Sequence, residues 1–238
     1  MTLIDERIAA LESNLRHAVT LAGDEPKPMM LSQRMVHYHT PGVSIAVIND
    51  GEIEWAKGYG VLNVDGAGPV TTATLFQAAS ISKVIAAVGT LKLVDAGKLD
   101  LDRDVNSYLK RWKVPVDEFT TAHPVTLRGI LSHTAGLSVH GFEGYEAGVP
   151  VPTLVDILDG KNGANSGSVQ VTCTPGTSYS YSGGGYTILQ LLLEDVMGKP
   201  FPVILNDLVL TPLGMTNSIF EQPLAPHRHV SAASGHQA

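Results

Sequence analysis

The strongest constraint on the fold of this chain is a hairpin signal near its N-terminus. Asn49-Asp50-Gly51 separates two runs that are rich in apolar and β-branched residues, Val43–Ile48 and Glu52–Ala56. An Asp-Gly pair between two such runs is typical of the short turn that joins antiparallel strands. We therefore expect a β-hairpin over residues 42–60.

An amphipathic helix is expected before this hairpin. Thr2 followed by Asp5 resembles a capping box at the start of a helix. A helix with one apolar face needs a surface to cover, and the hairpin supplies one. Together the two elements indicate an α/β layer, which we assign to residues 1–65. The apolar residues that recur at helical spacing are Ile4, Ile8, Leu11, Leu15 and Val19.

A second, mainly helical part is expected over residues 66–238. From about Phe76 the apolar period becomes helical, and it ends before Gly97, a residue type that is common at helix C-termini. Residues 136–185 are rich in Gly, Ser, Thr and Pro, and so long a loop region inside a domain is usually functional or mobile. The helical stripe consists of Ile81, Val84, Ile85, Val88, Leu91 and Val94. Shorter helices are expected over residues 125–131, 153–158, 186–197 and 201–210.

Composition and charge exclude several classes of protein. The 238 residues carry 16 Lys+Arg against 23 Asp+Glu, a formal net charge of −7. No basic cluster is longer than Lys110–Lys113, which is interpreted as a solvated helix end, so no nucleic-acid partner is expected. With 44% hydrophobic and 16% charged residues, the chain is not of the disordered class. A single cysteine, Cys173, excludes an intrachain disulfide.

The apolar segments do not suggest a membrane or an export route. The N-terminal 22 residues carry charges among their apolar residues, and no run approaches the roughly 18 apolar residues of a membrane span. We therefore expect a soluble, cytoplasmic protein with no membrane partner. The histidine pairs at positions 37/39 and 227/229 lack further ligands and are interpreted as surface residues, so no metal is expected.

Ser80 and Lys83 form a Ser-x-x-Lys pattern at the start of the predicted long helix. Residues i and i+3 share a face of a helix, so the Lys83 amine can lie beside the Ser80 hydroxyl. The helix N-terminus adds a positive electrostatic end that favours an alkoxide, and these features suit an activated serine nucleophile. The pattern alone is weak, because about one match is expected by chance in a chain of this length. Ser107 and Lys110 match it equally well.

The sequence around Ser80 supplies the context that the bare pattern lacks. Residues 74–83, Thr-Leu-Phe-Gln-Ala-Ala-Ser-Ile-Ser-Lys, resemble the nucleophile segment of the serine β-lactamase and penicillin-binding protein superfamily. Three further segments are similar to that superfamily in the same order and spacing: Leu131–Leu137, Pro175–Ser182 and Pro212–Thr216. Within the superfamily the chain resembles the class C β-lactamase-like esterases, the family VIII-type serine hydrolases.

The resemblance implies a β-lactamase-like, or transpeptidase-like, fold of the α/β plus all-α class. In that fold helices flank an antiparallel sheet, and a helical domain carries the nucleophile. The family's third motif, Lys-Thr-Gly or a variant of it, lies on a strand far downstream of the tyrosine. Only 57 residues follow Tyr181, and Ser234-Gly235-His236 is no credible third motif. We therefore expect the C-terminal part of the sheet to be missing from this chain.

Carried over by position, the resemblance gives Ser80 the role of acyl-accepting nucleophile and Lys83 that of a base or charge partner. Tyr181 would relay the proton, because a phenol beside an ammonium group is shifted toward phenolate. The Ser80 backbone N–H would serve as one oxyanion donor, and the second donor would be lacking. No cofactor is implied. The residues placed in substrate binding are Gln77, Ser182 and Gly183.

Gly183 departs from the family pattern. The family's tyrosine usually begins a Tyr-x-Asn motif, whereas Tyr181-Ser182-Gly183 has glycine in the third position. Without the asparagine amide, recognition of an acylamide is weakened, and a simple ester does not need that contact. An alternative interpretation is that the glycines at 183–185 allow positive φ angles in a tight turn.

The leading interpretation is a serine hydrolase that cleaves small-molecule carboxylic esters through an acyl-enzyme on Ser80. The first alternative is a β-lactamase or D-amino-acid peptidase with the same nucleophile. The second is a non-catalytic fragment or pseudoenzyme that acts by binding a partner. An unfinished sheet exposes an unpaired strand edge. We therefore expect any active form to gain strands from a second polypeptide or within a homo-oligomer.

Overall fold

The structure, a computed structural model, describes residues 2–17, 19, 21–23, 25, 27–66, 68–146 and 148–235. It divides into two units, the first combining residues 1–78 with 221–238 and the second comprising residues 79–220. The first unit extends to residue 78, whereas the expected division lies at residue 65, and the chain returns to this unit after residue 220. There Leu75 N donates to Ser231 O (2.9 Å), and Ser234 N donates to Leu62 O (2.9 Å).

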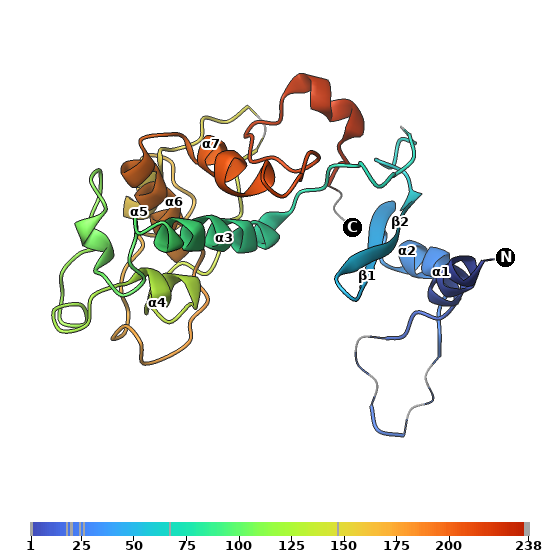
Figure 1. Ribbon diagram of the computed structural model, residues 1–238, viewed down its shortest axis with the longest axis horizontal. Coiled ribbons are helices and arrows are strands. Elements are labelled where there is room, and N and C mark those ends of the chain that lie inside the picture. The colour runs from blue at the N-terminus through green and yellow to red at the C-terminus, as the bar shows by residue number, and fades with distance from the viewer. Residues whose placement is uncertain are drawn as a thin grey trace. The chain divides into compact units, whose positions relative to one another are not determined.

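The predicted hairpin is confirmed in the first unit (Figure 1). Strand β1 (Gly42–Asn49) pairs antiparallel with β2 (Glu52–Gly60). Asp50 and Gly51 join them with φ angles of 50° and 81°, as a two-residue turn that matches the strand twist requires. A β-bulge interrupts the register after Val47. In the described ranges the sheet consists of these two strands.

Helix α1 (Leu3–Ser13) confirms the predicted capping box but is shorter than the predicted helix. Asp5 N donates to Thr2 Oγ1 (3.1 Å), and Thr2 N donates to Asp5 Oδ2 (2.7 Å). The helix ends before Leu15, whose backbone pairs with that of Met29 in an isolated antiparallel bridge instead. Val19, the last residue of the predicted stripe, therefore lies outside the helix.

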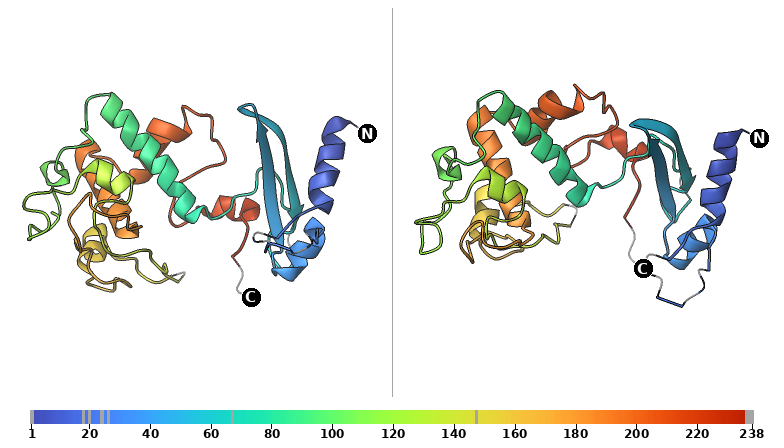
Figure 2. Two further views of the ribbon diagram at one scale, coloured as in Figure 1. Left: turned by 90° about the horizontal axis from the view of Figure 1, so that it is seen from below. Right: turned by 60° about the horizontal axis from the view of Figure 1, so that its bottom comes forward.

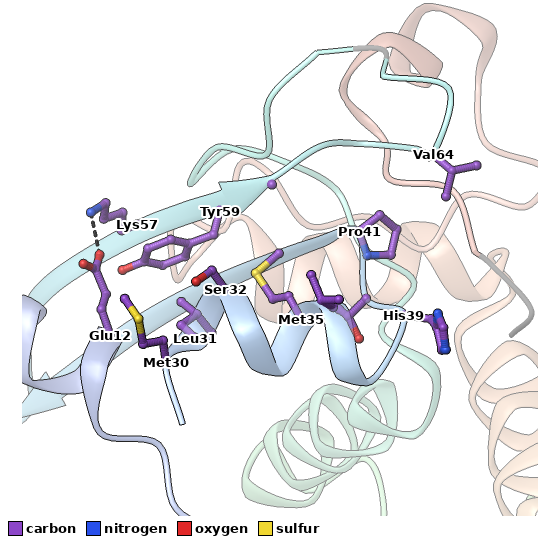
Figure 3. A pocket seen from close by; sticks show the side chains of 13 residues that line it. Glu12, Met30, Leu31, Ser32, Met35, His39, Pro41, Lys57, Tyr59 and Val64 are labelled. Atoms are coloured by element: carbon purple, nitrogen blue, oxygen red, sulfur yellow. Dashed lines mark hydrogen bonds and ion pairs between the residues drawn. The ribbon is translucent and has the colours of Figure 1, made fainter. Parts of the chain in front are cut away.

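Helix α2 (Leu31–His37) lies beside the hairpin (Figure 2). With β2 it lines a mostly apolar cavity of about 730 Å³, whose side chains are drawn in Figure 3. At one end of the cavity Lys57 Nζ forms an ion pair with Glu12 Oε1 (2.7 Å). Burial of the phenol, together with the neighbouring Glu12 carboxylate, raises the pKa of Tyr59 to about 12. The Tyr59 side chain in this cavity is therefore neutral at physiological pH.

The second unit is mainly helical and is organised around α6 (Gly183–Met197), which packs against four neighbouring helices. Its core includes Leu189, Leu191, Leu192 and Leu193, which are fully buried. None of the helices in the described ranges has both the length and the apolar composition of a membrane span. The neighbours of α6 are α3 (Ser82–Asp95), α4 (Leu127–Leu131), α5 (Leu154–Asp159) and α7 (Phe201–Leu205). The unit also contains 3₁₀ turns at Ala79–Ile81 and Val105–Ser107, and a π turn at Asn206–Leu210; a further 3₁₀ turn, Pro226–Ser231, belongs to the first unit.

The buried face of α3 is not the predicted apolar stripe. Ala86, Gly89 and Leu93 are buried, whereas Ile81 and Val84 of the stripe are exposed. A Cβ at position 89 would lie 2.8 Å from Cδ2 of a leucine on α7. Small residues on this face allow α7 to approach closely, and this packing decides which side of α3 turns inward.

The basic cluster at Lys110–Lys113 anchors a loop to α6, which corrects its interpretation as a solvated helix end. Lys110 N and Arg111 N donate to Asp195 Oδ2 (2.6 and 3.1 Å), and Arg111 Nε donates to Asp195 Oδ1 (2.6 Å). Burial favours the neutral carboxyl of Asp195, but these hydrogen bonds outweigh it and hold its pKa below the usual range. The loop is thereby fixed to the central helix of the unit.

Candidate active site

Ser80 lies at the entrance to α3, as the Ser-x-x-Lys pattern predicts. The 3₁₀ turn Ala79–Ile81 leads it into the helix, and Lys83 Nζ donates to Ser80 Oγ (3.0 Å). Ala79 has a φ of 42°, a left-handed conformation that costs a non-glycine residue about 1–3 kcal/mol. Backbone strain is therefore held directly beside the residue predicted to be the nucleophile.

Tyr181 reaches the same hydroxyl from a distant part of the sequence. Its phenol OH donates to Ser80 Oγ (2.9 Å) across 101 residues. Lys83 Nζ lies 5.0 Å from the ring centroid of Tyr181 and 5.5 Å from that of Tyr186. The second unit thus brings together the three residues predicted to be catalytic.

The surroundings of Tyr181 favour its ionised form. Contact with Lys83 is the main cause of a lowered pKa for Tyr181, the hydrogen bond with Ser80 adds to it, and slight burial opposes it. Burial raises the pKa of Tyr186, which keeps that phenol neutral. Because a phenolate can accept a proton, the geometry allows Tyr181 to act as a base toward Ser80.

Ser182, predicted to bind substrate, has its side chain committed to the protein. It is 3% exposed, and its Oγ donates to Ser138 O (2.6 Å) and accepts from Gly185 N (2.9 Å) as the N-cap of α6. A buried hydroxyl with a donor and an acceptor partner in the protein is not available to a substrate. The expected substrate contact is therefore replaced by a capping role next to Tyr181.

The glycines at 183–185 form the first turn of α6 and have no positive φ, which corrects their interpretation as a tight turn. A Cβ at Gly183 would lie 3.1 Å from His140 O and 3.3 Å from the Phe142 ring. The loop that carries these two residues therefore crowds the point at which the family's asparagine side chain would start. Gly183 N donates to His140 O (3.0 Å), so this residue serves close packing instead of the expected substrate contact.

Two further predicted features lie in the first unit. Gln77 is exposed and lines a cavity of about 320 Å³, and its role in substrate binding stays a prediction. Ser234 and Gly235 line the same cavity, while His236 lies outside the described residues.

The role of the Ser80 backbone N–H as an oxyanion donor also stays a prediction. Across the described ranges, no three His, Cys, Asp or Glu side chains gather into a metal-binding group.

His133 is a neighbour of the site that sequence reasoning missed. Its ring centroid lies 4.3 Å from that of Tyr181 and 5.4 Å from that of Tyr186. It belongs to Leu131–Leu137, one of the four segments that carry the family resemblance, and it is the titratable residue of that segment. A titratable side chain inside a structural signature is the signal that could have pointed to it.

A family model described as Beta-lactamase matches residues 29–237. Among curated proteins, the chain is 35% identical over 183 residues to penicillin-binding protein 4 of Amycolatopsis lactamdurans, which covers 76% of this chain and 45% of the relative. It is 30% identical over 207 residues to an unguisins hydrolase of Aspergillus campestris, which covers 82% of this chain and 36% of the relative. The chain therefore spans less than half the length of these two relatives.

Solved structures agree with this match. The octameric penicillin-binding protein homologue of Pyrococcus abyssi aligns with a TM-score of 0.64 and 28% identity, covering 78% of this chain and 42% of that one. EstCE1, a hydrolase with promiscuous acyltransferase activity, has a TM-score of 0.62 and 26% identity, with coverages of 77% and 49%. The D-amino acid amidase of Ochrobactrum anthropi has a TM-score of 0.62 and 27% identity, with the same coverages. With its described hairpin and helical unit forming part of the β-lactamase-like fold, the chain belongs to the beta-lactamase family, within the superfamily of serine β-lactamases and penicillin-binding proteins.

Proposed function

We propose that this protein is a serine hydrolase that cleaves carboxylic esters through an acyl-enzyme on Ser80. The observation that carries the proposal is the convergence of Lys83 Nζ (3.0 Å) and Tyr181 OH (2.9 Å) on Ser80 Oγ. Similarity to EstCE1, a hydrolase with acyltransferase activity, supports acyl transfer as the chemistry.

In the acylation half-reaction, Tyr181 acts as a phenolate and takes the hydroxyl proton of Ser80 while Oγ bonds to the ester carbonyl carbon. The Lys83 ammonium stabilises the negative charge as it passes from the phenolate to Oγ. Collapse of the tetrahedral intermediate breaks the carbon–oxygen bond to the alcohol, which leaves with the proton that Tyr181 holds. Ser80 then carries the acyl group, and Tyr181 is again a phenolate.

In the deacylation half-reaction, a water molecule gives a proton to Tyr181 as its oxygen bonds to the acyl carbonyl carbon. Collapse of the second intermediate returns that proton to Ser80 Oγ and releases the carboxylic acid. A positioned base typically contributes about 10²–10⁴ in rate. One phenol therefore serves as base and acid in both halves, and no second side chain has to transfer a proton.

Position 183 favours esters over amides as substrates. Glycine offers no side-chain amide there, and His140 O and Phe142 Cε2 lie within 3.3 Å of the point where a Cβ would start. No amide donor therefore extends from this position toward the acylamide of a β-lactam or peptide. A simple ester has no acylamide to be recognised.

Replacement of the nucleophile tests the proposal. We expect Ser80→Ala to lower turnover of a p-nitrophenyl ester by about a thousandfold or more, as in serine hydrolases that lose the nucleophile. Ser107→Ala is the matched control, because Ser107 also begins a Ser-x-x-Lys pattern but donates to Asp104 O (2.7 Å) in a 3₁₀ turn. Mass spectrometry of quenched protein should locate the acyl group on the Ser80 peptide. Equal turnover by Ser80→Ala and the native protein would rule the assignment out.

A β-lactamase or D-amino-acid peptidase with the same nucleophile is the second candidate. Similarity to a penicillin-binding protein and to a D-amino acid amidase favours it. Nitrocefin, a D-amino-acid amide and a short-chain ester assayed side by side separate the two candidates. Faster turnover of nitrocefin or the amide than of the ester would replace the ester assignment, and no turnover of any of them would support a non-catalytic binding protein.

A further inference from the structure

His133 restrains the backbone on both sides of Tyr181. Its main-chain oxygen accepts from Ser180 N (2.8 Å), and its Nδ1 accepts from Ser182 N (3.1 Å). Residues 179–182 belong to neither a helix nor a strand, so no regular ladder of backbone hydrogen bonds fixes the tyrosine. The two bonds to His133 therefore hold the residues immediately before and after it.

The imidazole ring also packs against the tyrosine itself. Its centroid lies 4.3 Å from that of Tyr181 with the planes at 32°, and 5.4 Å from that of Tyr186 with the planes at 39°. Lys83 Nζ lies over both tyrosine rings. These contacts favour the ring orientation in which the Tyr181 hydroxyl donates to Ser80 Oγ.

The position of His133 is in turn set by α4. It follows the helix with a φ of 58°, and the next residue, Thr134, donates its N–H to Gly129 O (2.8 Å) inside α4. A left-handed histidine is uncommon, so the backbone here is held by its surroundings. Because α4 packs against α6, the restraint on Tyr181 comes from the helical core of the unit.

The imidazole can accept from Ser182 N only when it is neutral. Nδ1 must then be unprotonated, with the ring proton on Nε2. Burial is the main cause of a lowered pKa for His133, and the charges of Lys83 on α3 and of His140 in the following loop lower it further. The remaining ring neighbours are the phenols of residues 179, 181 and 186. Burial and the two neighbouring charges favour the neutral imidazole, whereas a phenolate on Tyr181 favours the protonated ring.

We propose that neutral His133 is a positioning residue that holds the Tyr181 hydroxyl on Ser80. Its side-chain hydrogen bond goes to Ser182 N, not to Ser80 or Lys83, so it acts through Tyr181. The inference rests on the proposed role of Tyr181 as the base of the reaction. It is independent of which ester is the substrate.

Two substitutions separate the hydrogen-bond acceptor from the ring. His133→Phe keeps a ring but removes the acceptor, and we expect kcat for a p-nitrophenyl ester to fall about 10- to 100-fold with KM within about threefold. His133→Asn keeps an acceptor at similar reach and should stay within about fivefold of native kcat. Asparagine does not titrate. The plot of kcat against pH for His133→Asn should therefore lack one step that the native protein shows below the ordinary histidine pKa of about 6.5.

His140→Asn is the matched control for these variants. The His140 ring also lies near that of Tyr181, 4.9 Å between centroids, but in the described residues its side chain bonds no neighbour of the tyrosine. We expect its kcat to change by less than about twofold, as for surface substitutions in general. A loss in His140→Asn as large as that in His133→Phe would overturn the specific role of His133.

The ultraviolet absorbance of tyrosinate gives a readout that needs no turnover. The titration of Tyr181 is obtained as the difference between a protein and the same protein with Tyr181→Phe. It should move to higher pH in His133→Phe, because the phenol then moves away from the charge of Lys83. In His133→Asn it should stay in place. If esters are not hydrolysed and this pattern still holds, the ester function fails and the positioning role stands. The positioning role is wrong if His133→Phe hydrolyses esters as fast as the native protein. It is also wrong if both variants lose kcat and Tm to the same extent and the titration of Tyr181 is unchanged.

Discussion

Lys83 is the residue on which both hydroxyl groups of the site depend. It donates to Ser80 Oγ at 3.0 Å and lies 5.0 Å from the centroid of the Tyr181 ring. In the proposed mechanism, one ammonium group therefore stabilises a phenolate on Tyr181 and the negative charge that develops on Ser80. Replacing this charge should alter the ionisation of the tyrosine as well as the rate.

We expect Lys83→Met to shift the titration of Tyr181 to higher pH. The pKa of Tyr181 is lowered chiefly by Lys83, so without that charge it should rise toward the ordinary phenol value of about 10. Since the proposed reactive form is the phenolate, any residual ester hydrolysis should begin its rise with pH at a higher pH than in the native protein. Tyrosinate absorbance and kcat/KM across pH measure both effects.

Lys98→Met is the control for this charge change. Lys98 follows the same helix, is exposed, and lies outside the group of residues around Tyr181. Its substitution should leave the tyrosine titration and the pH profile of hydrolysis in place. An unshifted titration in Lys83→Met would show that Lys83 does not control the ionisation of Tyr181.

The residues of the site differ in how far sequence could predict them. The contact between Ser80 and Lys83 is local, because a spacing of three residues at a helix start fixes their geometry. The contact of Tyr181 with Ser80 spans 101 residues. Its prediction therefore rested on the family resemblance and not on any periodic pattern in the sequence. The partners of His133 and Ser182 depend on how two loops meet, which no local pattern reports.

At the scale of elements, the first turn of α6 is set by close packing. A methyl group on Gly184 would meet Val169 Cγ2 at 2.7 Å and Ser138 O at 3.0 Å. Overpacking of this kind costs about 1–3 kcal/mol, whereas alanine gains about 1 kcal/mol over glycine in a helix. Because a backbone oxygen is among the crowded atoms, the steric cost should exceed the gain.

We therefore expect Gly184→Ala to lower the free energy of unfolding by about 1–2 kcal/mol. Gly167→Ala is the matched control, since a Cβ at that position would have open space within 4 Å and the φ of Gly167 is not positive. Its stability should stay within about 0.5 kcal/mol of that of the native protein. Denaturant unfolding at constant m-value measures both. A Gly184→Ala variant as stable as the native protein would contradict the packing argument.

Element boundaries were predictable where a cap is local. The capping boxes of α1 and α5, at Thr2 with Asp5 and at Thr153 with Asp156, lie within four residues of sequence. The buried face of α3 was not predictable from its apolar stripe, because α7 approaches the small residues on the other side. Shape complementarity between two helices is a tertiary property, and the apolar period of one of them does not encode it.

At the scale of the whole molecule, the described sheet of the first unit has two strands and therefore two outer edges. In the part of the chain that the structure describes, β1 and β2 pair with each other and with no third strand. A hairpin is only marginally stable by itself in water, and an unpaired edge attracts further strands. The gain of strands from a second polypeptide or within a homo-oligomer stays a prediction.

Size-exclusion chromatography with light scattering tests this prediction when ester turnover is measured in every fraction. We expect turnover to elute with a species heavier than the 25.2 kDa monomer, because the added strands would cover the open edges. Ser80→Ala should elute at the same mass without turnover, which separates assembly from catalysis. A stable, active monomer of 25.2 kDa would contradict the prediction.

The three side chains assigned to the proposed proton relay come from one uninterrupted stretch, residues 79–220. Their mutual distances are therefore set within a single block of sequence, and insertions or exchanges in the flanking segments leave those distances unchanged. The proposed proton relay can therefore be inherited as one contiguous stretch of sequence.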